Sequence, residues 1–159
     1  MGWTRFDLDH HAQRIVLAAR KRDLAAHTDK SEMCSLNQAH KMRTSCAFGL
    51  ERFWGEHLRL KLSDSNVDKN KAEFIADTWK ALTVYLLPKE IQLPRELLKG
   101  GKNKEEDQKL AVDLAEEFAA KIWRFNENTY DRSVALAILT NLCDAIIWWK
   151  QRLKTAKGD

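Results

Sequence analysis

Residues 133–149 read SVALAILTNLCDAIIWW, an apolar run with few polar interruptions. A helix formed by this segment would be apolar around most of its circumference, and such a helix is buried. We therefore expect a helix from about Asn128 or Thr129 to Lys157 at the centre of a bundle, unless another subunit covers part of its surface.

The rest of the chain also repeats its apolar residues at helical spacing, and it lacks alternating β patterns and Asn-Gly or Asp-Gly hairpin signals. The fold class is therefore all-α: a single-domain bundle of about five helices with a largely buried C-terminal helix. The other four helices are expected from about Asp7 or Asp9 to His27, from an N-cap at residues 28–31 to about Leu62, from Val67 to Leu87, and from Lys104 to Asn126.

Two breaks are expected between the third and fourth of these helices. Pro88 ends the third helix, because proline restricts the residue before it and cannot continue the helical hydrogen bonds. Pro94 favours a short helical turn over residues 94–98, and residues 99–104 form a flexible basic loop. Neither flank has enough apolar surface for its own core, so residues 1–159 are interpreted as one helical domain.

Composition narrows the class of protein. The chain has 159 residues, of which 44% are hydrophobic, and this size suits one core without disulfides or a structural metal. Its three cysteines are widely spaced and form no C-x-x-C pair, which favours a reducing, cytoplasmic setting. The first residues lack the apolar core of a signal peptide, and no membrane association is expected.

The positive charge is unevenly distributed. The net charge is +4, and residues 1–62 alone contain 11 Lys or Arg against 7 Asp or Glu. Residues 106–131 contain 3 against 7, so an acidic segment offsets the basic one. Basic segments of this kind favour polyanionic partners.

On a continuous second helix, Lys41, Arg52 and Arg59 would lie within about 20° of one another, because they are spaced by eleven and seven residues. Phe48 falls beside them, and cations with an interleaved ring suit a phosphate backbone with base stacking. The alternative is a solvated helix face. The first helix would extend this ridge if it lies alongside. The candidate nucleic-acid-binding residues are Arg14, Lys21, Lys41, Phe48, Arg52 and Arg59.

The C-terminal end has two further features. A second cluster of cations lies at this end of the sequence: Lys150, Arg152, Lys154 and Lys157. Cations at the C-terminal end of a helix interact favourably with its dipole, and this explains the cluster without a binding site. The adjacent Trp148 and Trp149 cannot both face one core stripe, so Trp148 is a candidate contact with a partner.

The sequence contains only weak matches to motifs that are typical of catalytic sites. Arg22…His27 fits R-x4-H, which resembles the active-site motif of HEPN ribonucleases, but Arg5…His10 and Arg52…His57 fit it equally well. No phosphate-binding glycine loop, nucleophile elbow or zincin motif is present in the sequence.

Metal ligation is not expected either. His10 and His11 point about 100° apart on a helix, so their rings do not share one metal easily. Cys34, His40 and Cys46 follow one another at intervals of six residues, which places each about 120° from the last on a helix. No catalytic residue, metal or cofactor is therefore predicted.

The segment TNLCDAIIWWKQRL, residues 140–153, resembles the closing helix of the small subunit of type III-B CRISPR effector complexes. In that family an apolar run ends in a tryptophan followed by basic residues. The resemblance implies a non-catalytic subunit that stacks in several copies along a guide-RNA complex and presents cations to the target or displaced strand. Its implied partners are nucleic acid, other subunits of the complex and copies of itself.

Three functions therefore remain open. The first is a nucleic-acid-binding small subunit of an RNA-guided complex, in which base pairing reads the sequence and the protein supplies backbone electrostatics. The second is a HEPN-like, metal-independent ribonuclease, and the third is a helical protein-interaction module.

Overall fold

The computed structural model describes residues 5–28 and 34–153, and those residues form an all-helical bundle without strands. The predicted fold class is confirmed, with six α-helices where the sequence predicted about five. They are α1 (Arg5–Ala25), α2 (Gln38–Ser45), α3 (Leu50–Lys61), α4 (Asn66–Lys80), α5 (Lys104–Asn126) and α6 (Thr129–Leu153).

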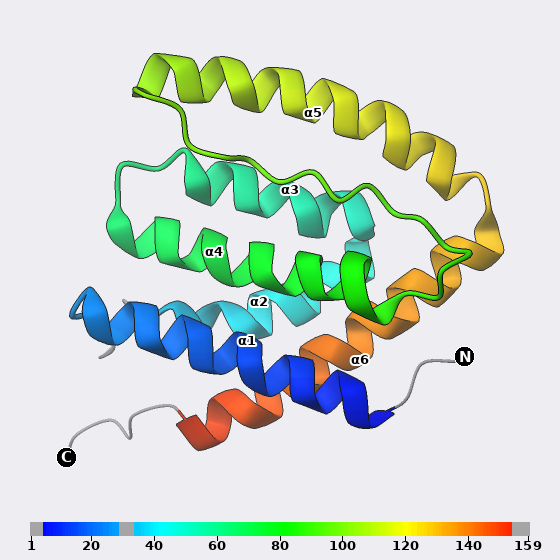
Figure 1. Ribbon diagram of the computed structural model, residues 1–159, viewed down its shortest axis with the longest axis horizontal. Coiled ribbons are helices and arrows are strands. Elements are labelled where there is room, and N and C mark those ends of the chain that lie inside the picture. Colours follow the sequence, from blue (N-terminus) through cyan, green and yellow to red (C-terminus); the bar gives the residue numbers. More distant parts are fainter. Residues whose placement is uncertain (1–4, 29–33, 154–159) are drawn as a thin grey trace.

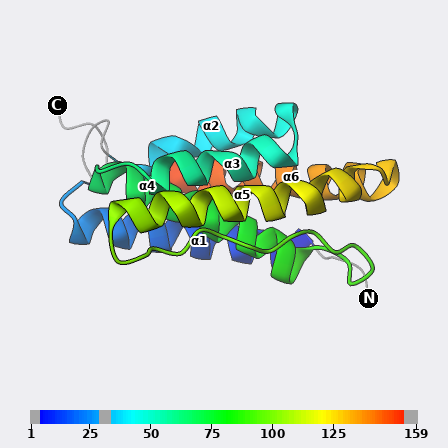
Figure 2. The same cartoon turned by 90° about the horizontal axis from the view of Figure 1, so that it is seen from above.

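The helices form two layers. In Figure 1, α1, α4, α3 and α5 follow one another across the molecule, and α6 crosses behind them on a diagonal. The view from above shows α2 at one edge and the connection between α4 and α5 at the other (Figure 2). The largest fully buried side chains are contributed mainly by α3, α4 and α6, among them Phe53, Trp79 and Leu142.

The predicted second helix is wrong in one respect, because the structure breaks it at Gly49. A short 3₁₀ helix, η3 (Cys46–Phe48), follows α2, and Gly49 then adopts a φ of 107° before α3 begins. A side chain is strained at this φ, and a Cβ there would lie 2.9 Å from Glu51 Oε1. The chain turns back at Gly49, so α2 and α3 run in opposite directions (Figure 1).

The turn that leads into α2 is held in place by the buried carboxylate of Asp23. Asp23 of α1 accepts hydrogen bonds from the backbone N–H of Ser35 at 2.9 Å and from its hydroxyl at 2.8 Å. Ser35 opens η2 (Ser35–Asn37), a 3₁₀ turn that leads into α2. Most of the predicted cap at residues 28–31 lies outside the described residues, and within them Asp23 joins the end of α1 to η2.

The third predicted helix ends before Pro88 as expected. Its last six residues form a π-helix, η4 (Ala81–Leu86), and Leu87 is already extended with ψ at 142°. Residues 91–101, here called the connecting segment, then run back along the bundle beside α3 to the start of α5 (Figure 1).

The connecting segment contains no helical turn at residues 94–98, which corrects the prediction made from Pro94. Side chains of α3 and α4 bind its backbone instead. The indole N–H of Trp79 donates to the Pro94 carbonyl at 3.0 Å, and that of Trp54 donates to the Glu96 carbonyl at 2.8 Å. The Leu98 N–H donates to His57 Nε2 at 3.1 Å. These bonds satisfy buried backbone groups that a helical turn would have paired internally.

The C-terminal helix α6 packs its inner face against α1, α2 and α5. Seven of its 25 residues are buried, including Leu139, Leu142 and Ile146, so the helix is buried along its inner face and not around most of its circumference as predicted. Among the described helices, only α6 is long and apolar enough by composition to cross a membrane, and a core helix of a soluble bundle passes the same test.

Candidate nucleic-acid interface

The structure brings together Phe48 and Arg52 from the predicted ridge. Phe48, at the end of η3, is 58% exposed, and Arg52 lies on the exposed side of the first turn of α3. The guanidinium carbon of Arg52 lies 5.6 Å from the centre of the Phe48 ring, within the range of a cation–π contact. Lys41 is exposed on α2, which leads into η3. We call Lys41, Phe48 and Arg52 the Phe48 platform.

The sequence that leads to Phe48 lacks acidic side chains. Residues 34–50 include three cations or histidines, namely His40, Lys41 and Arg43, and no Asp or Glu. The nearest carboxylate in sequence, Glu51, faces α5, where it accepts a hydrogen bond from Asn126 Nδ2 at 3.5 Å. A basic stretch without acids beside an exposed ring suits a phosphate backbone, and the nearby Glu56 of α3 is paired with Arg59.

Arg59 differs from the other ridge residues because its charge is paired. Its guanidinium donates to both carboxylate oxygens of Glu56 at 2.5 to 3.1 Å. These hydrogen bonds raise the pKa of Arg59 above its ordinary value. The break at Gly49 also removes the continuous helix that would have aligned Arg59 with Lys41, so the predicted common ridge is corrected to the smaller Phe48 platform.

Arg14 and Lys21 do not extend the platform from alongside α3. Both are exposed on α1. However, α1 packs against α4 and α6, and α4 separates it from α3 (Figure 1). The predicted extension needed neighbouring helices, so these two residues form part of a different surface.

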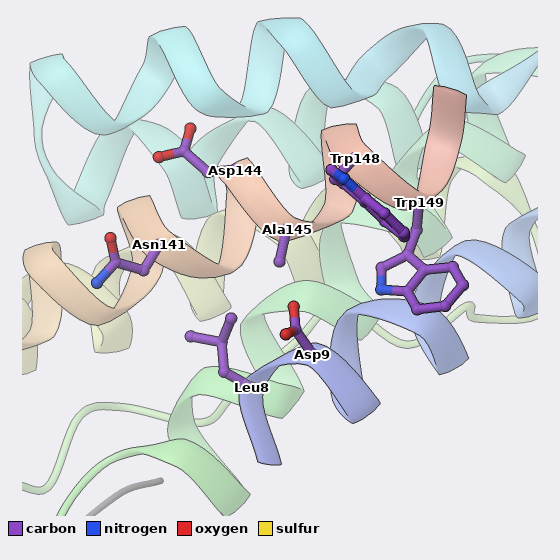
Figure 3. Close-up of a pocket in the computed structure, with 7 residues that line it drawn as sticks. All are labelled: Leu8, Asp9, Asn141, Asp144, Ala145, Trp148 and Trp149. Atoms are coloured by element: carbon purple, nitrogen blue, oxygen red, sulfur yellow. The ribbon is translucent and has the colours of Figure 1, made fainter. Parts of the chain in front are cut away.

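Trp148 lines a groove of about 660 Å³ between α1 and α6 (Figure 3). Its side chain is 48% exposed, whereas Trp149 is partly buried against the core. The Arg152 guanidinium lies 3.5 Å from the centre of the Trp148 ring and donates to the Trp148 carbonyl at 2.9 Å. The groove is lined by Leu8, Asp9, Asn141, Asp144, Ala145, Trp148 and Trp149.

Two acidic side chains of this groove, Asp9 and Asp144, were not among the predicted site residues. Asp144 lies one helical turn before Trp148, a spacing that the sequence does display. It accepts a hydrogen bond from Arg43 Nε of α2 at 2.7 Å, a partner 101 residues away that the sequence does not reveal. The groove therefore combines an aromatic surface with carboxylates, unlike the Phe48 platform.

The other C-terminal cations are not gathered into one site. Lys150 is 7% exposed, and Arg152 lies over Trp148. Lys154 and Lys157 lie outside the described residues.

In the two R-x4-H pairs that the structure describes, the arginine and the histidine have different surroundings and partners. His57 is 1% exposed and holds the connecting segment, while Arg52 faces outward at Phe48. Arg22 donates to Asp77 at 2.9 Å, and the exposed His27 lies in the turn after α1 with a φ of 57°. The side chain of Arg5 lies outside the described residues, so the first pair is not placed.

No three His, Cys, Asp or Glu side chains gather in a metal-binding arrangement within residues 5–28 and 34–153. His10 and His11 have ring centres 6.2 Å apart with planes tilted by 43°. Cys34 lies against Asp23, whereas Cys46 lies against Cys143 of α6, so the Cys34, His40 and Cys46 series forms no common site.

Comparisons with protein-family models, curated proteins and solved structures found no match to this chain.

Proposed function

We propose that this protein is a non-catalytic, single-strand-binding small subunit of a multi-subunit RNA-guided complex, and that the Phe48 platform contacts the nucleic acid. The observation that carries the proposal is the exposed cation–π pair of Phe48 and Arg52. Phe48 belongs to a 17-residue stretch, residues 34–50, that contains no Asp or Glu. Lys41 and Arg52 replace counterions at phosphates, and the Phe48 ring offers a face on which any base stacks.

Assembly with other subunits is the second part of the proposal. The groove at Trp148 supports it, because a half-exposed tryptophan that lines a groove is a common anchor of protein interfaces. The resemblance of residues 140–153 to the closing helix of type III-B small subunits adds the expectation of stacked copies. The three free cysteines suit a reducing cytoplasm.

Fluorescence anisotropy with labelled single-stranded RNA and DNA tests the first part. Affinity should fall between about 50 and 200 mM salt, with each neutralised phosphate adding about 0.7 to the log–log slope. The double variant Lys41→Gln/Arg52→Gln should lower that slope by about 1.4. Phe48→Ala should raise Kd roughly tenfold with little change in slope, because it removes stacking rather than charge.

Lys69→Gln provides the matched control, since Lys69 is exposed on α4, away from the platform. It should leave both slope and Kd close to those of the wild type. Absence of binding at the lowest salt would contradict the proposal, and an equal effect of Lys69→Gln would contradict the assignment to the Phe48 platform.

A further inference from the structure

Two buried thiols from distant parts of the chain lie in contact. Cys46 of η3 and Cys143 of α6 are 97 residues apart in sequence, and their Sγ atoms are 3.8 Å apart. Cys143 is fully buried and Cys46 is 6% exposed. Both are free thiols in the structure. A disulfide has an S–S length of about 2.05 Å, so the two sulfurs must approach by about 1.8 Å in total.

The elements that carry these thiols are already joined beside them. Arg43 precedes Cys46 by three residues and donates to Asp144, the residue after Cys143, at 2.7 Å. Cys46 is further fixed by a hydrogen bond from its thiol to the Met42 carbonyl at 3.4 Å. The Arg43–Asp144 pair thus sets the position of α2 and η3 against α6, and the Cys46–Met42 bond fixes the Cys46 thiol within its own segment.

We propose that Cys46 and Cys143 are a site of reversible oxidation, at which a peroxide converts the contacting thiols into an intramolecular disulfide. This inference is independent of the proposed nucleic-acid binding. In the first step the Cys46 sulfur attacks the peroxide, so that an S–O bond forms and the O–O bond breaks, giving a sulfenic acid and one water. In the second step the Cys143 sulfur displaces that oxygen, so that the S–S bond forms and a second water leaves with the Cys143 proton. Two thiols are oxidised and one peroxide is reduced.

The two sulfurs have different roles in this sequence. The hydrogen bond with Cys143 lowers the pKa of Cys46, whereas the same bond and complete burial raise the pKa of Cys143. Thiolate is the attacking species, and Cys46 is also the less buried of the two residues. Cys46 is therefore the peroxide-reacting residue, and Cys143 resolves it.

Cys34 supplies an internal control. It is 1% exposed, burial raises its pKa, and its thiol donates to Asp23 rather than to another cysteine. Only two of the three thiols should therefore disappear on oxidation.

The experiment treats the folded full-length protein with hydrogen peroxide, removes the oxidant, unfolds the chain and alkylates the remaining thiols. Mass spectrometry should find one alkylated cysteine, Cys34, together with a peptide pair linked through Cys46 and Cys143. Three alkylated thiols, a link through Cys34, or a disulfide between two chains would overturn the inference. Dithiothreitol should restore all three thiols.

Two further measurements separate chemistry from folding. In Cys143→Ser the sulfenic acid has no resolving partner, so a dimedone probe should label Cys46, and absence of this label would contradict the assigned order. In the oxidised wild type, closure of so long a loop should raise Tm by roughly 5 to 15 °C. An unchanged or lower Tm would show that the native packing does not accommodate the bond.

Discussion

Replacing His57 with leucine should lower the free energy of unfolding by about 1–3 kcal/mol, because the buried Leu98 N–H loses its acceptor at His57 Nε2. The Trp54 carbonyl also loses the hydrogen bond from His57 Nδ1. Leucine retains an apolar side chain of similar size, so the variant reports mainly on these polar contacts. For a domain of this size the change corresponds to a fall in Tm of roughly 3 to 10 °C.

Urea unfolding followed by circular dichroism measures this difference, and the slope m should be unchanged because the folded surface is retained. His10→Leu is the matched control, since His10 is exposed on α1. The control should remain within about 0.5 kcal/mol of the wild type. If His57→Leu also fell within that range, the inference that His57 anchors the connecting segment would be refuted.

The same residue predicts a pH dependence. Burial lowers the pKa of His57 below its ordinary value of 6.5, because the charged ring is poorly solvated there. As the pH falls below about 6.5, the unfolded chain binds a proton at His57 that the folded chain excludes, so stability decreases. The difference between wild type and His57→Leu should therefore shrink from pH 7.5 to pH 5, and a constant difference would contradict this reasoning.

Three other changes have expected outcomes. Gly49→Ala should destabilise the protein by more than about 1 kcal/mol, because φ is 107° at this position. Gly55→Ala should instead stabilise α3 by about 0.5–1 kcal/mol, because the added Cβ would meet no neighbouring group within 4 Å. Urea titrations of the two variants measure both differences. Trp148→Ala should reduce self-association in sedimentation velocity without changing Tm by more than a few degrees, and unaltered association would remove Trp148 from the interface. Labelled RNA should stay intact during incubation without metal, and cleavage that His27→Ala abolishes would favour the ribonuclease alternative.

Helical periodicity was sufficient to predict the all-α class, because each long helix buries one regular apolar face. The break at Gly49 was not predictable in the same way, since the apolar spacing of residues 39–60 continues through it. The signal was present only as a glycine, which a helix interior tolerates at a cost of about 1 kcal/mol. The effect on the candidate site was large, because the predicted alignment of Lys41 with Arg59 depended on a continuous helix.

Local and distant pairings differ in how far the sequence reveals them. The pairing of Arg59 with Glu56 follows from an i, i+3 spacing and was open to prediction. The bonds from Trp54 and Trp79 to the connecting segment join residues 42 and 15 positions apart, and a tryptophan looks the same in sequence whether its indole N–H meets solvent or a carbonyl. Cys46 and Cys143 illustrate the same limit, because nothing in their spacing indicates contact.

The connecting segment also carries a consequence for the order in which the protein folds. Three of its backbone groups are bonded by side chains of α3 and α4, which are adjacent in sequence and pack against each other. We therefore expect the segment to become ordered after these two helices have paired, because it needs their side chains as partners. In native-state hydrogen exchange, the Leu98 amide should exchange together with the α3 and α4 core rather than with a surface loop.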